Sequence, residues 1–133
     1  MIVIADANPW VRRELGLYMS AQLGGESIVE ARSPSAVLDA IADPKRRILV
    51  IDPRMPTRGQ CDGIPLLRQI CRLRPELFVV VLSEEPHRLL RQRNLPPGIA
   101  HAYRKQMSPA WLWHIVTPAL RAAEAAQENA ASG

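Results

Sequence analysis

Apolar and polar residues alternate in blocks along the chain, and the blocks predict strands and helices in turn. Short, mostly apolar runs predict buried strands at residues 1–5, 27–31, 48–51, 78–82 and 99–103. Stretches with apolar residues three or four positions apart predict amphipathic helices at residues 9–23, 36–42, 64–74, 86–93 and 109–126. Five strands that alternate with five helices indicate an α/β fold, in which helices cover both faces of a parallel sheet.

Serine and proline residues mark the boundaries of the predicted helices. Ser33-Pro34 and Ser108-Pro109 each pair a capping hydroxyl with a proline suited to the first helical position. Pro118 lies inside the last predicted helix, where it should kink or locally break it. We expect residues 1–126 to form one domain and residues 127–133, "QENAASG", to be a disordered tail.

Length and composition narrow the class of protein. A chain of 133 residues suits one domain, and its hydrophobic fraction of 47% suits a soluble globular protein. No apolar run approaches the ~20 residues that span a bilayer, and Asp6 interrupts the first apolar run, so no signal peptide is visible and we expect a cytoplasmic protein. Cys61 and Cys71 form neither a disulfide framework nor a zinc motif, and we expect two reduced thiols, with Cys71 in a core.

The formal net charge of +4 would suit nucleic acid or an acidic partner. The few aromatic residues are not interleaved with the arginines, which disfavours a stacking platform for single-stranded nucleic acid. We therefore interpret most of the basic residues as solvated faces of helices.

Polar residues follow four of the predicted strands. Asp6, Asp52, Ser83 and Lys105 come at or just after the strand ends, and in an open parallel sheet the ligand site lies at that edge. Each alone has a structural explanation, as a helix cap, a turn residue or a solvated lysine. Together, two carboxylates, a hydroxyl and an ammonium at one edge predict a functional site.

The motifs at these strand ends resemble the receiver domain of two-component response regulators. The matching runs are "VIADANP", "VIDPRMP", "VVVLS" and "RKQMSP". The long run "MPTRGQCDG" and the following "DGIPLLRQI" are similar to the receiver of the Rcs-phosphorelay capsule regulator, in the NarL/FixJ-type group. The resemblance covers nearly the whole chain and implies a flavodoxin-like (βα)5 fold in three layers, with strand order 2-1-3-4-5.

The resemblance also implies roles for individual residues. Asp52 matches the phosphoacceptor, Ser83 the hydroxyl that hydrogen-bonds the phosphoryl group, and Lys105 the ammonium that pairs with both. Mg²⁺ would be held by Asp6, Asp52 and the backbone carbonyl of Arg54. A carboxylate is a competent nucleophile on phosphorus when a divalent ion offsets the incoming charge.

Two positions depart from the family pattern. Ala7 replaces the carboxylate that binds magnesium directly, so the magnesium site should be weak. Ala102 stands at the aromatic switch position, and Tyr103 follows it on the opposite face of the strand. These departures leave two functions open: a phosphorylated receiver, or a degenerate receiver-like module that binds partners without phosphate.

The expected function is a signalling receiver, not an enzyme. It would be the N-terminal regulatory domain of a transcriptional regulator, with a sensor histidine kinase or phosphotransfer protein as partner and DNA contacted only through a further domain. An aspartate-nucleophile phosphatase of the haloacid dehalogenase type is set aside, because that family has a second aspartate where Arg54 stands. The predicted helices at 9–23 and 109–126 carry Trp10, Trp111 and Trp113, which suggests a homodimer or partner surface there.

Overall fold

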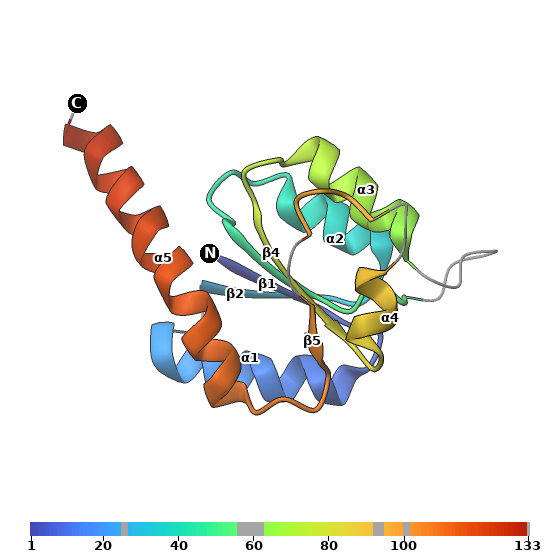
Figure 1. Cartoon of the computed structure of the whole chain (residues 1–133). Coiled ribbons are helices and arrows are strands. Elements are labelled where there is room, and N and C mark those ends of the chain that lie inside the picture. Colours follow the sequence, from blue (N-terminus) through green and yellow to red (C-terminus); the bar gives the residue numbers. More distant parts are fainter. Residues whose placement is uncertain (25–26, 56–62, 92–94, 100–101, 133) are drawn as a thin grey trace.

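The computed structural model describes residues 1–24, 27–55, 63–91, 95–99 and 102–132. The strands are β1 (Ile2–Ala5), β2 (Ile28–Ala31), β3 (Ile48–Ile51), β4 (Phe78–Ser83) and β5 (Ala102–Arg104). The helices are α1 (Pro9–Leu23), α2 (Pro34–Ile41), α3 (Ile64–Leu73), α4 (Pro86–Leu90) and α5 (Pro109–Ser132). All strand pairs are parallel and the order is β2-β1-β3-β4-β5, so the predicted fold and strand order are confirmed (Figure 1).

The sheet separates two hydrophobic cores. Alternate residues of a strand point to opposite faces, so Val3 of β1 packs in the core beneath α2 and α3, whereas Ile4 packs in the core beneath α1 and α5. Strands β1 and β3 are buried along their whole length, as expected for central strands covered on both faces. Figure 1 shows the resulting three layers, with α1 and α5 on one side of the sheet and α2, α3 and α4 on the other.

The predicted cap-plus-proline signals mark real helix starts. The Oγ of Ser33 accepts a hydrogen bond from the backbone N–H of Ala36 at 3.2 Å. The Oγ of Ser108 accepts one from the N–H of Trp111, also at 3.2 Å. Each hydroxyl satisfies a backbone donor that the first turn of a helix leaves unpaired.

Arg74, the residue after α3, links α3 to the α2–β3 connection at the edge of the sheet where the strands begin. Its guanidinium donates hydrogen bonds to the backbone carbonyls of Ile41, Asp43 and Arg46, and it also pairs with Glu76. One side chain thus binds three carbonyls at the end of α2 and in the α2–β3 connection, of which that of Asp43 also accepts from the N–H of Arg46, so Arg74 holds that connection against α3.

Helix α5 differs from its sequence prediction. The helix is unbroken from Pro109 to Ser132, so a local break at Pro118 is wrong, whereas the alternative, a kink there, stays a prediction. Pro118 is exposed, whereas Val116 and Leu120 on either side are buried in the core and hold the helix across the proline. The helix also continues beyond Ala126, the expected end, and the division into a domain of residues 1–126 and a tail of 127–133 stays a prediction.

The remaining differences are at the edge of the sheet. Strand β5 begins at Ala102 and is shorter than the predicted 99–103, and α4 ends at Leu90. Within the described segments, every helix is too short or too polar to cross a membrane.

Candidate functional site

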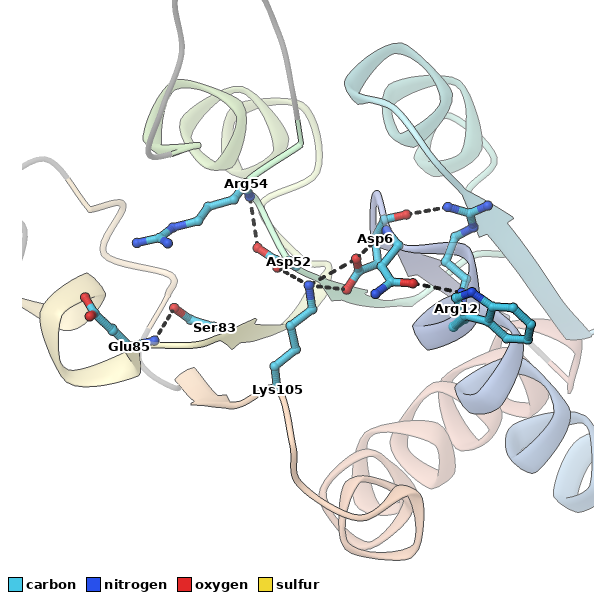
Figure 2. Close-up of polar contacts among 9 residues, drawn as sticks. Asp6, Arg12, Asp52, Arg54, Ser83, Glu85 and Lys105 are labelled. Carbon is cyan, nitrogen blue, oxygen red and sulfur yellow. Dashed lines mark hydrogen bonds and ion pairs between the residues drawn. The ribbon is translucent and has the colours of Figure 1, made fainter.

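The four polar residues predicted at the strand ends all lie at one edge of the sheet. Asp6 follows β1, Asp52 follows β3, Ser83 ends β4 and Lys105 follows β5 (Figure 2). Backbone hydrogen bonds extend the sheet to these residues: the N–H of Asp52 donates to the carbonyl of Ala5 at 3.0 Å, and that of Lys105 to the carbonyl of Ser83 at 3.1 Å. The side chains are therefore positioned by the sheet itself.

Lys105 joins the two carboxylates. Its Nζ lies 2.7 Å from Oδ2 of Asp52, and 3.1 and 3.2 Å from Oδ2 and Oδ1 of Asp6. Asp6 is only 2% exposed and Asp52 only 7%. The two carboxylates carry more charge than the one ammonium between them, so the pocket keeps a net negative charge.

The contacts of Lys105 determine its protonation. Burial alone would lower its pKa, but the hydrogen bond and charge attraction to Asp52, and then those to Asp6, outweigh burial and raise the pKa above its ordinary value. The side chain is thus a fixed cation at neutral pH.

Each of the two carboxylates also accepts a hydrogen bond from a backbone N–H. Oδ1 of Asp52 accepts a hydrogen bond from the N–H of Arg54 at 3.0 Å, and Oδ1 of Asp6 accepts one from the N–H of Asn8 at 2.8 Å. Oδ2 of Asp6 is buried without a hydrogen bond and has only the ion pair with Lys105. Among the described residues of the pocket, it is the one buried side-chain oxygen without a hydrogen-bond donor.

Ser83 lies at the same edge but is not joined to the carboxylates. It is 4% exposed, and its Oγ accepts a hydrogen bond from the N–H of Glu85 at 3.1 Å. Within the described residues no hydrogen bond links its Oγ to the side chain of Asp52 or Lys105. Its hydroxyl hydrogen can therefore be donated to a group that enters the pocket.

Arg12 supports the site in a way that the sequence did not predict, since most basic residues were interpreted as solvated. Its side chain is 14% exposed, and its Nη1 donates to the backbone carbonyl of Asp6 at 2.6 Å (Figure 2). Its Nε lies 3.6 Å from Oε1 of Glu30. Arginine and carbonyl are six residues apart, around the turn that leads into α1, so no periodicity pairs them.

The family follows from comparison with known proteins. A model of the response regulator receiver domain matches residues 2–117. The chain belongs to the response regulator receiver domain family.

Solved receiver structures agree with this assignment at the level of the fold. The receiver domain of RcsB from Salmonella enterica serovar Typhimurium, solved with the phosphomimetic BeF3−, is 22% identical with a TM-score of 0.60, over 82% of this chain and 79% of that one. The receiver domain of NtrX from Brucella abortus is 24% identical with a TM-score of 0.70, over 91% and 98%. A signal receiver domain of an HD domain-containing protein from Pseudomonas fluorescens Pf-5 is 19% identical with a TM-score of 0.76, over 93% and 96%. No curated protein sequence matches.

Some relatives carry the receiver within a longer chain. A longer NtrX chain from Brucella abortus, solved with ADP, is 22% identical with a TM-score of 0.69, and the match covers 97% of this chain but only 28% of that one. A receiver of this size is thus compatible with attachment to further domains.

Few acidic side chains of the described residues are available to hold a metal ion at this site. Among the described residues, no three acidic, histidine or cysteine side chains gather in a group suited to a metal ion. Ala7, the exposed residue after Asp6, has no carboxylate to contribute as a ligand. The ligands on offer for Mg²⁺ are the two carboxylates, one with an oxygen lacking a hydrogen-bond donor, and the predicted carbonyl of Arg54. Such hard oxygen donors fit Mg²⁺, but their number is low.

Only the two ends of the loop after Asp52 are described. Gly63 has a left-handed φ of 72°, and a Cβ there would collide with the backbone carbonyl of Pro53. Glycine is therefore required for the loop to return against the strand end and begin α3. Pro56, Cys61 and Asp62 of the "MPTRGQCDG" run lie outside the described residues.

The residues predicted on opposite faces of β5 are found there. Ala102 packs against the core beneath α2 and α3, and Tyr103 against the core beneath α1 and α5. Ala102, which the resemblance matched to the aromatic switch position, is thus a small side chain on the face that carries α2 and α3.

The tryptophans lie on neighbouring helices, as predicted. Trp10 is 74% and Trp111 58% exposed, whereas Trp113 is half-buried against the core. Leu17, seven residues after Trp10 on α1, is a further exposed apolar residue that the sequence analysis did not single out, although its spacing places it on the same face of the helix.

Proposed function

We propose that this receiver accepts a phosphoryl group on Asp52 from a sensor histidine kinase or phosphotransfer protein. The observation that supports it is the buried carboxylate of Asp52, held by the N–H of Arg54 on one oxygen and by Lys105, 2.7 Å away, on the other. We further propose that the domain is the N-terminal regulatory part of a transcriptional regulator, and that it acts as a switch and not as an enzyme.

The chemistry is an in-line displacement at phosphorus. A carboxylate oxygen of Asp52 forms a bond to the phosphorus of a phosphohistidine while the bond from phosphorus to the histidine nitrogen breaks, and the nitrogen keeps the electron pair. Lys105 then pairs with a phosphoryl oxygen, and the hydroxyl of Ser83 donates to another. Both groups favour the state that carries more negative charge.

Mg²⁺ would be held by Asp6, Asp52 and the backbone carbonyl of Arg54. When bound, it supplies positive charge that offsets the charge of the phosphoryl group. Because Ala7 contributes no carboxylate, we expect half-maximal phosphorylation only at unusually high magnesium.

A titration of magnesium against labelling by acetyl phosphate tests this proposal. We expect wild type to be labelled only at high Mg²⁺, Ala7→Asp to be labelled at a concentration about tenfold lower, since one added charge-assisted ligand contributes on the order of 1.4 kcal/mol or more, and Asp52→Asn never to be labelled. Labelling of wild type at the same magnesium as Ala7→Asp would show that Ala7 is harmless.

A second candidate function is a phosphate-independent interaction module. Ala7 favours it, because the missing carboxylate weakens the magnesium site on which the phosphoryl chemistry depends. Absence of labelling and of beryllofluoride binding even in Ala7→Asp would support this second function and contradict the first.

We also propose a homodimer or partner surface on α1 and α5. Both helices lie on the same face of the sheet and pack against one another there. Trp10, Leu17 and Trp111 expose large apolar side chains on these helices, and exposed aromatic residues are enriched at protein interfaces.

A further inference from the structure

A hollow bounded by described residues lies away from the acidic pocket. It has a volume of about 600 Å³ and is bounded by the second half of α3, the start of β4 and residues 95–98. These residues lie on the face of the sheet that carries α2 and α3, as the orange segment beside α3 shows in Figure 1. The hollow shares no residue with the acidic pocket.

The hollow exists because this part of the core is incompletely covered. Residues 95–98, with two prolines, cover it as an irregular segment beside α3. Cys71, Val79 and Leu95 border the core but are only half-buried, and Leu77 is buried beside them. The floor of the hollow is therefore apolar and partly open to solvent.

The rim of the hollow is cationic. Arg68 and Arg72 line it from the exposed side of α3. The guanidinium of Arg74 also lines it, and donates to backbone carbonyls and pairs with Glu76. None of the described lining residues is acidic. An apolar floor beneath two arginines is complementary to a molecule with an apolar body and an acidic end.

We propose that this hollow binds a small amphipathic anion, whose apolar body lies against Leu77, Val79 and Leu95 and whose carboxylate or sulfonate is bound by Arg68 and Arg72. The volume lies within the roughly 300–1,000 Å³ that is usual for small-molecule sites. Guanidinium groups suit the planar carboxylate because they can bind it through two parallel hydrogen bonds.

Cys71 provides a direct test, because its thiol lies in the wall of the hollow. In a Cys61→Ser background the rate of alkylation of Cys71 by a neutral maleimide would be measured with and without dodecanoate, below the concentration at which it forms micelles. A bound ligand covers the thiol, so dodecanoate at ten times its Kd should slow alkylation about tenfold. Burial raises the pKa of the Cys71 thiol, so a mildly alkaline buffer is used.

Variants test separately whether binding needs the two arginines and whether it needs the empty apolar space. Arg68→Gln with Arg72→Gln should weaken protection by dodecanoate at least tenfold, and the matched control Arg121→Gln, exposed on α5, should not change it. Gly98→Leu should abolish protection by filling the hollow; a Cβ at this position meets only Sγ of Cys71, at 3.8 Å.

Three outcomes would overturn the proposal. They are no protection by dodecanoate, equal protection by the neutral alcohol dodecanol, and protection that survives both the double arginine substitution and Gly98→Leu. Asp52→Asn should leave protection unchanged, so this test does not depend on the proposed phosphorylation.

Discussion

Replacing Lys105 with methionine removes the only side-chain cation within 4 Å of the two site carboxylates among the described residues. The variant keeps a side chain of similar length, so packing changes little. Asp6 and Asp52 would remain almost fully buried, with their negative charges facing one another and no ammonium between them. We therefore expect Lys105→Met to destabilise the folded protein.

The size of the effect follows from the contacts. Removing one partner of a buried ion pair typically costs about 3–5 kcal/mol, because the remaining charge stays desolvated. The Lys105 side chain is 18% exposed, and solvent screens part of the charge, so we expect the lower end, about 3 kcal/mol. With a urea m value of about 1.5 kcal/mol/M, the midpoint should fall by roughly 2 M.

Urea unfolding followed by tryptophan fluorescence measures this difference. Because the folded-state pKa of Lys105 is raised, the stabilisation by its charge should be fully present below its unfolded value of 10.5 and should disappear as pH rises through the higher folded value. Lys45→Met, which removes an exposed lysine, is the matched control and should shift the midpoint little. A midpoint for Lys105→Met within 0.3 M (roughly 0.5 kcal/mol) of wild type at pH 7 would refute the reasoning.

Three further predictions follow from other contacts. Arg74→Ala removes the side-chain donor of three backbone carbonyls, of which that of Asp43 keeps its hydrogen bond from the N–H of Arg46, and should lower the free energy of unfolding by about 2–3 kcal/mol. Replacement of the exposed Arg72 by alanine should change it by less than about 0.5 kcal/mol. Equal values for the two variants in urea unfolding would contradict the structural role assigned to Arg74. Gly63→Ala introduces a collision and a left-handed alanine and should cost more than about 2 kcal/mol, measured as a fall in thermal midpoint; an unchanged midpoint would show that the loop rearranges freely. Trp10→Ala with Trp111→Ala should shift the sedimentation profile toward monomer; a wild type already monomeric at high concentration, with no partner contact on α1 or α5, would exclude the interface.

Much of the fold could be predicted because its signals are local. Apolar runs such as "ILVI" of β3 are buried on both faces, so their pattern alone indicates a central parallel strand. Ser33 and Ser108 mark helix starts through hydrogen bonds that span three residues. The convergence of Asp6, Asp52 and Lys105 could be predicted as well, since parallel strands place their carboxyl ends at one edge.

What could not be predicted depends on contacts between distant segments. The bond from Arg12 to the carbonyl of Asp6 and the contacts of Arg74 require knowledge of where a long side chain ends, which sequence spacing does not contain. The continuity of α5 across Pro118 depends on core packing on either side of the proline, which outweighs the local cost of a missing hydrogen bond. The half-covered hollow beside α3 is visible only once residues 95–98 are placed.

The central claim, that Asp52 is the phosphoacceptor, is tested most directly by locating the phosphoryl group. After treatment with acetyl phosphate and magnesium, borohydride reduction would convert an aspartyl phosphate to homoserine, and peptide mass spectrometry would identify the residue. We expect homoserine at position 52 alone, in wild type at high magnesium and in Ala7→Asp at lower magnesium. Homoserine at any other position, or none in Ala7→Asp at saturating magnesium, would contradict the account.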